Sequence, residues 1–205
     1  MAVSHSARVI LLTGPSGAGK SRLAGRLHAA HGWPVLTLDD FYRELHDPCL
    51  PRSPLGIPDW DHVDSWDAEA ALAALRQLIL DGSALVPVYD IRASVVTGRR
   101  LLSCAPRDRV VAEGLFATRL VERLRTEGLL AEVLCVRRNR WLTFGLRLAR
   151  DLAERRKPAW ILVRRGLALL RAEPQLVADA VACGARTITP RRAEAELRRA
   201  RHTRV

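Results

Sequence analysis

The chain has 205 residues, of which 48% are hydrophobic and 27% are charged, a balance typical of a globular protein rather than a disordered one. No run of about 18 apolar residues is free of charge, which excludes a membrane-spanning helix, and the apolar run Val9–Leu12 is too short for the core of a signal peptide. We therefore expect one domain over residues 1–205, located in the cytoplasm.

The formal net charge of +11 is unevenly distributed along the chain. Residues 1–136 carry 15 Lys and Arg against 16 Asp and Glu, whereas residues 137–205 carry 18 against 6. Such a basic block could bind polyphosphate, RNA or DNA, or it could coat a helical surface. Arginine is the usual cation, since Lys20 and Lys157 are the only lysines, so a lysine marks a place where a point charge is wanted.

Apolar runs alternate with helical patterns along the chain. The expected elements are strand 8–13, helix 20–31, strand 35–38, loop 43–65, helix 66–80, strand 85–89, a hairpin through 95–96 and 101–102 that turns at 97–98, strand 109–112, helix 115–126, strand 131–136 and helices from 139 almost to 201. This order predicts an α/β fold with a doubly wound, mostly parallel sheet flanked by helices. A small hairpin insertion near residues 85–104 and a helical basic C-terminal region complete the prediction. The four scattered cysteines match no zinc spacing and indicate reduced thiols.

A glycine-rich turn between the first strand and the first helix fits the pattern G-x-x-x-x-G-K-[ST] at every fixed position. Its glycines let backbone N–H groups approach a phosphate, the helix adds its positive end, the lysine reaches the β- and γ-phosphates, and the terminal serine can hold Mg²⁺. The pattern predicts a P-loop that binds a nucleoside triphosphate with Mg²⁺. Its residues are Gly14, Pro15, Ser16, Gly17, Ala18, Gly19, Lys20 and Ser21.

Two larger classes of P-loop protein are excluded. GTPases read guanine with N-K-x-D, but the only asparagine, Asn139, is followed by Arg140, and the L-S-G-G-Q stretch of ABC ATPases is absent. A small kinase remains, which must place an acceptor hydroxyl beside the γ-phosphate. Asp39 and Asp40 follow the second strand, where one carboxylate could take the proton of that hydroxyl and the other could cap a helix. Their spacing does not decide between them.

A further carboxylate, Glu113, is a candidate ligand for Mg²⁺. Val110–Glu113 resembles a Walker B strand, and Glu113 would sit beside Ser21 and bind Mg²⁺ directly or through water.

The stretch 59–67 holds four aspartates, two tryptophans and a histidine. It lacks the glycine and the terminal glutamate of an EF-hand calcium loop. Two interpretations stay open with equal weight: capping of the following helix by Ser65 or Asp64, and an acceptor pocket in which an aromatic face and an aspartate hold a ligand.

Basic residues follow on the next predicted helix and its exit. Arg147 and Arg150 share a helix face, and with Arg155, Arg156 and Lys157 they could close over the transferring phosphoryl group or form a solvated basic face.

In combination these motifs resemble the uridine kinase family, which is related to phosphoribulokinase and to one type of pantothenate kinase. The resemblance runs over roughly residues 8–165. Besides the P-loop it rests on five stretches: Asp39-Asp40-Phe41-Tyr42, Trp60–Asp67, Pro87-Val88-Tyr89-Asp90, Glu113-Gly114 and the lid segment Arg147–Arg155.

The resemblance implies a transferase that phosphorylates the 5′-hydroxyl of uridine or cytidine with ATP and Mg²⁺, a pyrimidine salvage reaction. It implies Asp39 as general base, with Lys20, Arg150 and Arg155 stabilising the γ-phosphoryl charge, and a lid at about 139–170. It implies self-association. We expect no membrane partner, since no spanning helix is predicted, and no nucleic-acid partner is favoured, since the basic residues are not interleaved with aromatic ones as in RRM or OB strands. The residues implied for the acceptor are Asp39, Tyr42, Trp60, Asp61, Tyr89, Ser94, Arg147 and Arg150; Arg147 and Lys157 join the P-loop around ATP, and Ser21 and Glu113 hold the metal.

The segment after Pro87–Asp90, which reads the base in the family, departs from the family pattern. An aromatic residue and a base-reading histidine usually follow Pro-x-Tyr-Asp, and here these places hold Ile91 and Ser94. A serine can still bond a base edge. A kinase of a non-nucleoside metabolite on the same frame therefore stays an alternative, and so does a nucleotide-dependent nucleic-acid-binding protein that uses the basic C-terminal third.

Overall fold

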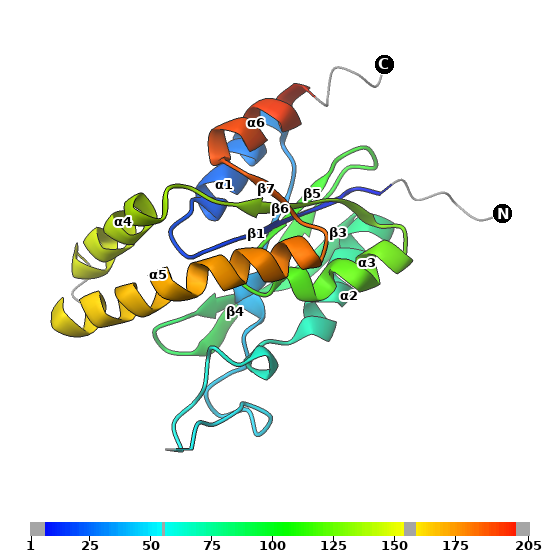
Figure 1. The fold of residues 1–205 in the computed structure, drawn as a ribbon. Coiled ribbons are helices and arrows are strands. Elements are labelled where there is room, and N and C mark those ends of the chain that lie inside the picture. Colours follow the sequence, from blue (N-terminus) through cyan, green and yellow to red (C-terminus); the bar gives the residue numbers. More distant parts are fainter. Residues whose placement is uncertain (1–6, 55, 154–158, 200–205) are drawn as a thin grey trace.

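The computed structural model describes residues 7–54, 56–153 and 159–199. Its centre is a five-stranded sheet in the order β2-β5-β1-β6-β7, and every neighbouring pair is parallel (Figure 1). The strands are β1 (Val9–Thr13), β2 (Val35–Thr37), β5 (Val110–Glu113), β6 (Leu130–Val136) and β7 (Arg186–Ile188). The predicted α/β fold with a mostly parallel sheet flanked by helices is confirmed.

Helices cover both faces of this sheet, so the central strand is apolar on both sides. Ile10 and Leu12 of β1 pack in one core with α1 (Lys20–His31) and α6 (Pro190–Arg199). Val9 and Leu11 pack in the other core with α2 (Ala68–Leu80), α3 (Val121–Thr126) and the C-terminal part of α5 (Ala159–Ala182). The whole of β1 is buried as a result, which explains its unbroken apolar sequence.

A separate hairpin lies beside the sheet, as predicted, but its turn is elsewhere. Strands β3 (Ser83–Asp90) and β4 (Val95–Ser103) pair antiparallel, and the chain turns at residues 91–94. The predicted turn at Thr97-Gly98 is wrong, because Gly98 lies within β4 opposite Val88. The Asp90 carboxylate accepts the N–H groups of Arg92 (2.7 Å) and Ala93 (3.3 Å), which holds the turn one residue after β3.

Several element boundaries also differ from the prediction. Strand β2 ends at Thr37, and a 3-10 helix, η1 (Leu38–Phe41), follows it. The expected helix 115–126 divides into η3 (Ala117–Leu120) and α3, and a further 3-10 turn, η2 (Val63–Ser65), precedes α2. The C-terminal region contains β7, which the sequence did not predict, since three residues that pair only with β6 carry too little pattern.

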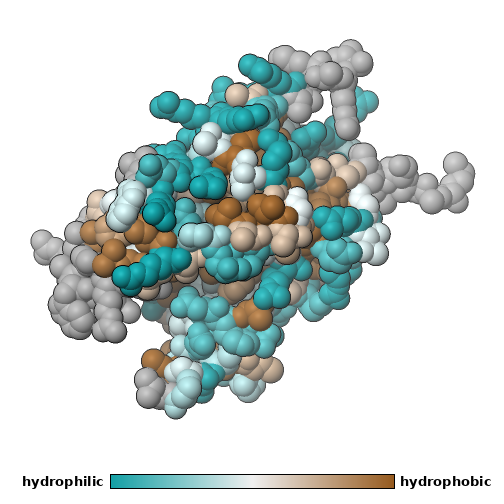
Figure 2. Space-filling model, viewed as in Figure 1, coloured by the Kyte–Doolittle hydropathy of each residue, from teal (hydrophilic) through white to brown (hydrophobic). Residues whose placement is uncertain are grey.

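Helices α4 (Arg140–Ala153) and α5 pack side by side and project from the sheet (Figure 1). They approach closely at Gly166, where a Cβ atom would lie 2.6 Å from the Phe144 ring. Apolar and hydrophilic residues lie next to each other over this pair (Figure 2). Within the described part of the chain, no helix is both long and apolar enough to cross a membrane.

Candidate active site

The P-loop runs from β1 to α1 and passes close to β6. Gly14 has a φ of +130°, and a Cβ atom there would lie 2.2 Å from the Val136 carbonyl oxygen. Gly17 and Gly19 also take positive φ values, of +83° and +98°, which L side chains rarely adopt. The loop can therefore curl against the sheet and present its backbone, as phosphate binding requires.

Lys20 begins α1 and folds over this loop. Its Nζ atom donates to the carbonyl oxygens of Gly14 (2.8 Å) and Pro15 (3.2 Å). Burial lowers the pKa of Lys20, and the nearby carboxylates of Glu113 and Asp39 act in the opposite direction. The ammonium group is thus held between the P-loop and two carboxylates.

Asp39 lies on η1, directly after β2, and faces the lysine. One carboxylate oxygen accepts the N–H of Leu115 at 3.4 Å. Burial raises the pKa of Asp39, while the charge of Lys20 partly opposes this shift. Gly114 permits the approach, because a Cβ atom there would lie 2.7 Å from Leu38 Cβ and 3.0 Å from Asp39 Oδ1.

Asp40 has different partners from Asp39, although the sequence alone did not separate them. Its carboxylate accepts the N–H of Tyr89 at 3.3 Å and lies 3.7 Å from the Arg100 guanidinium. Tyr89 and Arg100 belong to the hairpin. Asp40 therefore fastens the hairpin to η1, whereas Asp39 is the carboxylate beside Lys20.

Glu113 ends β5 and is buried, and its carboxylate accepts a hydrogen bond from the Ser21 hydroxyl. Burial raises the pKa of Glu113, against the effects of this hydrogen bond and of Lys20. Two adjacent oxygen donors fit Mg²⁺, which uses one or two protein ligands and fills its shell with phosphate and water. Among the described residues, no group of three or more His, Cys, Asp or Glu side chains could hold a metal by itself.

An aromatic cluster lies on the hairpin side of Asp39. The Tyr42 ring contacts the rings of Trp60, Tyr89 and Phe116 at centroid distances of 6.1, 6.2 and 6.0 Å. Burial raises the pKa of Tyr42, and the carboxylates of Asp39 and Asp61 raise it further. The sequence reasoning missed Phe116, for which the available signal was its place two residues after Gly114 at the end of β5.

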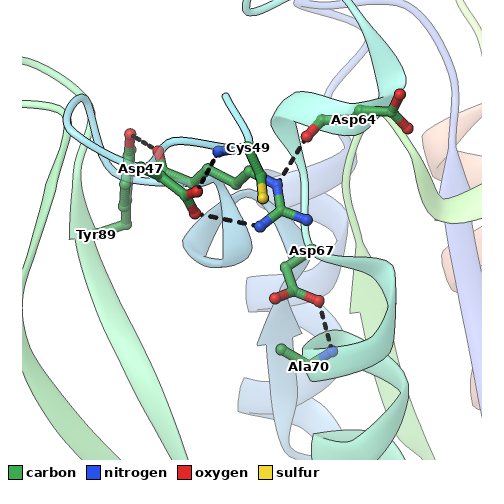
Figure 3. Close-up of polar contacts among 7 residues, drawn as sticks. Asp47, Cys49, Asp64, Asp67, Ala70 and Tyr89 are labelled. Carbon is green, nitrogen blue, oxygen red and sulfur yellow. Dashed lines mark hydrogen bonds and ion pairs between the residues drawn. The ribbon is translucent and has the colours of Figure 1, made fainter. Parts of the chain in front are cut away.

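Most of the stretch 59–67 is structural. Asp67 caps α2 by accepting the N–H of Ala70 at 2.9 Å (Figure 3), so the cap expected at Ser65 or Asp64 lies two or three residues later. Trp66 is buried and donates its indole N–H to the Leu38 carbonyl at 2.7 Å. Trp60 instead joins the aromatic cluster, and Asp61 is exposed near Tyr42. Helix capping thus occurs in this stretch, at Asp67, and an acceptor pocket at Trp60 and Asp61 stays a prediction.

The hairpin and the two loops beside it are joined by polar contacts (Figure 3). The Tyr89 hydroxyl donates to the Arg43 carbonyl at 2.9 Å, and the Arg43 guanidinium donates to the Asp64 carbonyl (2.8 Å) and the Asp47 carboxylate (3.1 Å). Ser94 has a φ of +55° at the hairpin turn, and its carbonyl accepts the N–H of Leu45 at 2.9 Å. Its hydroxyl lies 3.5 Å from the Ile91 carbonyl and also bonds Tyr89.

The predicted lid residues are only partly placed. Arg147 and Arg150 lie on α4, but the structure does not describe their side chains. Arg155 and Lys157 lie outside the described residues.

Comparisons with known proteins found a matching family model and related sequences. A family model described as an AAA domain matches residues 9–97. Uridine-cytidine kinase 2-B of Danio rerio is 34% identical over 83 residues, which are 40% of this chain and 31% of that protein. The chain thus spans less than a third of this relative's length. Uridine kinase of Leuconostoc citreum (strain KM20) is 26% identical over 152 residues, 72% of this chain and 70% of the relative.

A solved crystal structure shares the fold of this chain. It belongs to a protein of Silicibacter sp. TM1040, provisionally named a fructose transport system kinase, and it superposes with a TM-score of 0.58 at 20% identity over 92% of both chains. This chain therefore shares the fold of that protein, a parallel sheet flanked by helices with the P-loop between β1 and α1. The resemblance to uridine kinases expected from the motifs is also confirmed, since both sequence relatives carry that name.

Proposed function

We propose that this protein is a kinase that transfers the γ-phosphoryl group of Mg-ATP to a hydroxyl group of a small molecule, with the 5′-hydroxyl of uridine or cytidine as the favoured acceptor. One observation carries the proposal. Lys20, Asp39 and Glu113, which follow or end three neighbouring strands, interact with one another at the carboxyl edge of the sheet. Ligands bind at this edge in open α/β sheets.

Each of these residues has a defined role in phosphoryl transfer. Asp39 accepts the proton of the attacking hydroxyl, and Lys20 stabilises the charge on the β- and γ-phosphates. Ser21 and Glu113 hold Mg²⁺, which screens the phosphate oxygens when it is bound. Arg147, Arg150, Arg155 and Lys157 close over the phosphates from the lid.

The environment of Asp39 supports its role as a base. A carboxylate in water has a pKa far below neutrality and is a weak proton acceptor. Burial raises the pKa of Asp39 toward the working pH. A general base is most effective when its pKa approaches that pH.

The acceptor pocket supports a flat or ring-shaped acceptor. Tyr42, Trp60, Tyr89 and Phe116 offer aromatic surface next to Asp39, and Asp61, which lies near Tyr42, would bind hydroxyl groups of the acceptor. The names of both sequence relatives favour a pyrimidine nucleoside.

A kinase of another hydroxylated metabolite is the second candidate, and the hairpin turn favours it. Ile91 is 63% exposed, and the Ser94 hydroxyl already contacts Tyr89 and the Ile91 carbonyl. Neither residue supplies the imidazole expected of a uridine kinase.

ATP consumption with Mg²⁺ and a panel of acceptors tests both candidates. The panel contains uridine, cytidine, adenosine, ribose and pantothenate, with a blank that lacks acceptor. Turnover with uridine or cytidine alone supports the favoured acceptor, and turnover with ribose or pantothenate supports the second candidate. Consumption that does not depend on any acceptor contradicts the assignment of Asp39 as a base for a substrate hydroxyl.

A further inference from the structure

Arg100 of β4 reaches from the hairpin to the segment that carries Asp39. Its Nη2 atom donates to the Val35 carbonyl at 3.5 Å and lies 3.7 Å from Asp40 Oδ2. Val35 begins β2, and Asp40 lies on η1, which follows that strand directly. One nitrogen atom thus contacts both the start of the strand and the turn that together place Asp39.

The Val35 carbonyl can accept this bond because β2 is an edge strand of the sheet. The Val111 N–H of β5 donates to the carbonyl of the preceding residue, Pro34, at 3.0 Å. In a parallel pair only alternate residues of a strand bond the same neighbour, so the Val35 carbonyl points away from β5. Edge strands commonly need a cover for such groups, and here the hairpin supplies it through Arg100.

Asp40 links the same guanidinium to the aromatic cluster. Its second carboxylate oxygen, Oδ1, accepts the N–H of Tyr89 at 3.3 Å, and the Tyr89 ring contacts the Tyr42 ring. Burial raises the pKa of Asp40, whereas the Tyr89 N–H and the charge of Arg100 act in the opposite direction. Both contacts therefore favour the ionised form of Asp40, which the ion pair with Arg100 requires.

Asp39 and Asp40 are neighbours on η1, so a movement of one displaces the other. The bond between the Asp39 carboxylate and the Leu115 N–H is long, at 3.4 Å, and is a weak restraint by itself. We propose that Arg100 is a positioning residue that acts through Asp40: by holding η1 and the start of β2, it fixes Asp39 relative to the P-loop and the aromatic cluster. This role rests on the kinase function proposed above.

Steady-state kinetics of the full chain test this role, with uridine or whichever acceptor of the panel is turned over. The variants are Arg100→Gln, Arg100→Lys, Asp40→Asn, and the double variant that combines Asp40→Asn with Arg100→Gln. A misplacement of about 1 Å lowers a rate by about 100-fold, so Arg100→Gln should lower kcat by about 10- to 100-fold. The acceptor KM and the Kd of ATP should stay within about threefold, since Arg100 touches neither reactant.

The other variants separate positioning from a loss of stability. Arg100→Lys should recover most of kcat, because an ammonium group can replace the single nitrogen atom that makes both contacts. The double variant should be no slower than the slower single variant, since both substitutions remove one interaction. The matched control is Arg99→Gln, which removes the same charge from the exposed face of β4 and should leave kcat unchanged. All rates are measured below the unfolding temperature of each variant.

The amide of Leu115 gives a readout that does not depend on turnover. Its N–H bonds the Asp39 carboxylate, so its resonance in ¹H–¹⁵N NMR spectra reports the position of that group. The resonance should move in Arg100→Gln and stay in place in Arg99→Gln.

Four results overturn the proposal. An unchanged kcat in Arg100→Gln, or a Leu115 resonance that stays in place, shows that Arg100 only covers the edge of β2. A raised acceptor KM with an unchanged kcat makes Arg100 a part of the acceptor pocket, and single effects that multiply in the double variant show that it does not act through Asp40. A wild-type chain that turns over no acceptor refutes the kinase proposal instead, and the Leu115 resonance then still decides whether Arg100 holds Asp39.

Discussion

Replacing Gly114 with alanine should displace the proposed base. A Cβ atom at this position would lie 2.7 Å from Leu38 Cβ and 3.0 Å from Asp39 Oδ1. Carbon atoms pack at about 3.5–4.0 Å, so Leu38 and the start of η1 must move by about 1 Å. A misplacement of about 1 Å at a reacting group lowers the rate by about 100-fold. We expect kcat to fall by about this factor while the Kd of ATP stays within about twofold, because the atoms nearest to the new Cβ atom belong to Leu38 and Asp39.

Steady-state kinetics with the best acceptor, together with ATP titration and thermal unfolding, check this prediction. Overpacking should also cost about 1–3 kcal/mol of folding free energy. The matched control is Gly25→Ala on α1, where nothing lies within 4 Å of the new Cβ atom. An alanine in a helix should stabilise the protein there by about 0.5–1 kcal/mol and leave kcat unchanged. If kcat of Gly114→Ala remains within about threefold of wild type, the contact between Gly114 and Leu38 does not position Asp39.

Four further outcomes follow from the site. Asp39→Asn should abolish turnover and leave ATP binding nearly unchanged, measured by kinetics and calorimetry; retained turnover would move the base to Asp40. Asp61→Ala should raise the acceptor KM sharply, and an unchanged KM would make this stretch purely structural. Asp67→Ala removes the cap of α2 and should cost about 1 kcal/mol in thermal unfolding without a change in acceptor KM. The pH profile of kcat/KM should be bell-shaped, since Asp39 must lose its proton and Lys20 must keep its own; a profile flat across the accessible pH range would contradict both roles.

The parts of the site that the sequence predicted are those set by short spacing. The pattern of the P-loop fixes the backbone and the lysine within eight residues, and the buried strands before it and before Glu113 must be parallel neighbours in such a fold. The carboxyl ends of parallel strands meet at one edge, so Asp39, Lys20 and Glu113 could be expected to converge. In the structure these three side chains do lie close enough for their charges to influence one another's pKa values.

The features that the sequence did not predict depend on contacts between segments that are distant along the chain. Gly98 suggested a turn, but the Asp90 side chain and the bond between Leu45 and Ser94 place the turn earlier. Phe116 carries no motif of its own, and it joins the aromatic cluster only because β5 lies beside β2 in the sheet, which brings Phe116 to Tyr42. Asp39 and Asp40 are adjacent residues of the same type, so the sequence does not distinguish their roles. Their partners do: Asp39 accepts the N–H of Leu115, whereas Asp40 contacts Tyr89 and Arg100.

The buried charge of Asp39 also links catalysis to stability. The pKa of Asp39 is raised in the folded protein. Protonated Asp39 therefore favours the folded state, and this contribution to folding stability is fully present below the unfolded pKa of about 3.9. The contribution is lost as the pH rises through the folded pKa. At neutral pH the wild-type protein therefore carries the cost of an ionised, buried carboxylate, and Asp39→Asn does not. We expect the variant to unfold at a higher temperature at pH 7, and the difference should vanish as the pH falls toward about 4. A difference that is independent of pH would show that folding does not shift the pKa of Asp39. An asparagine variant that is less stable at pH 7, with a deficit that shrinks as the pH falls, would show that the attraction of Lys20 outweighs burial at this carboxylate.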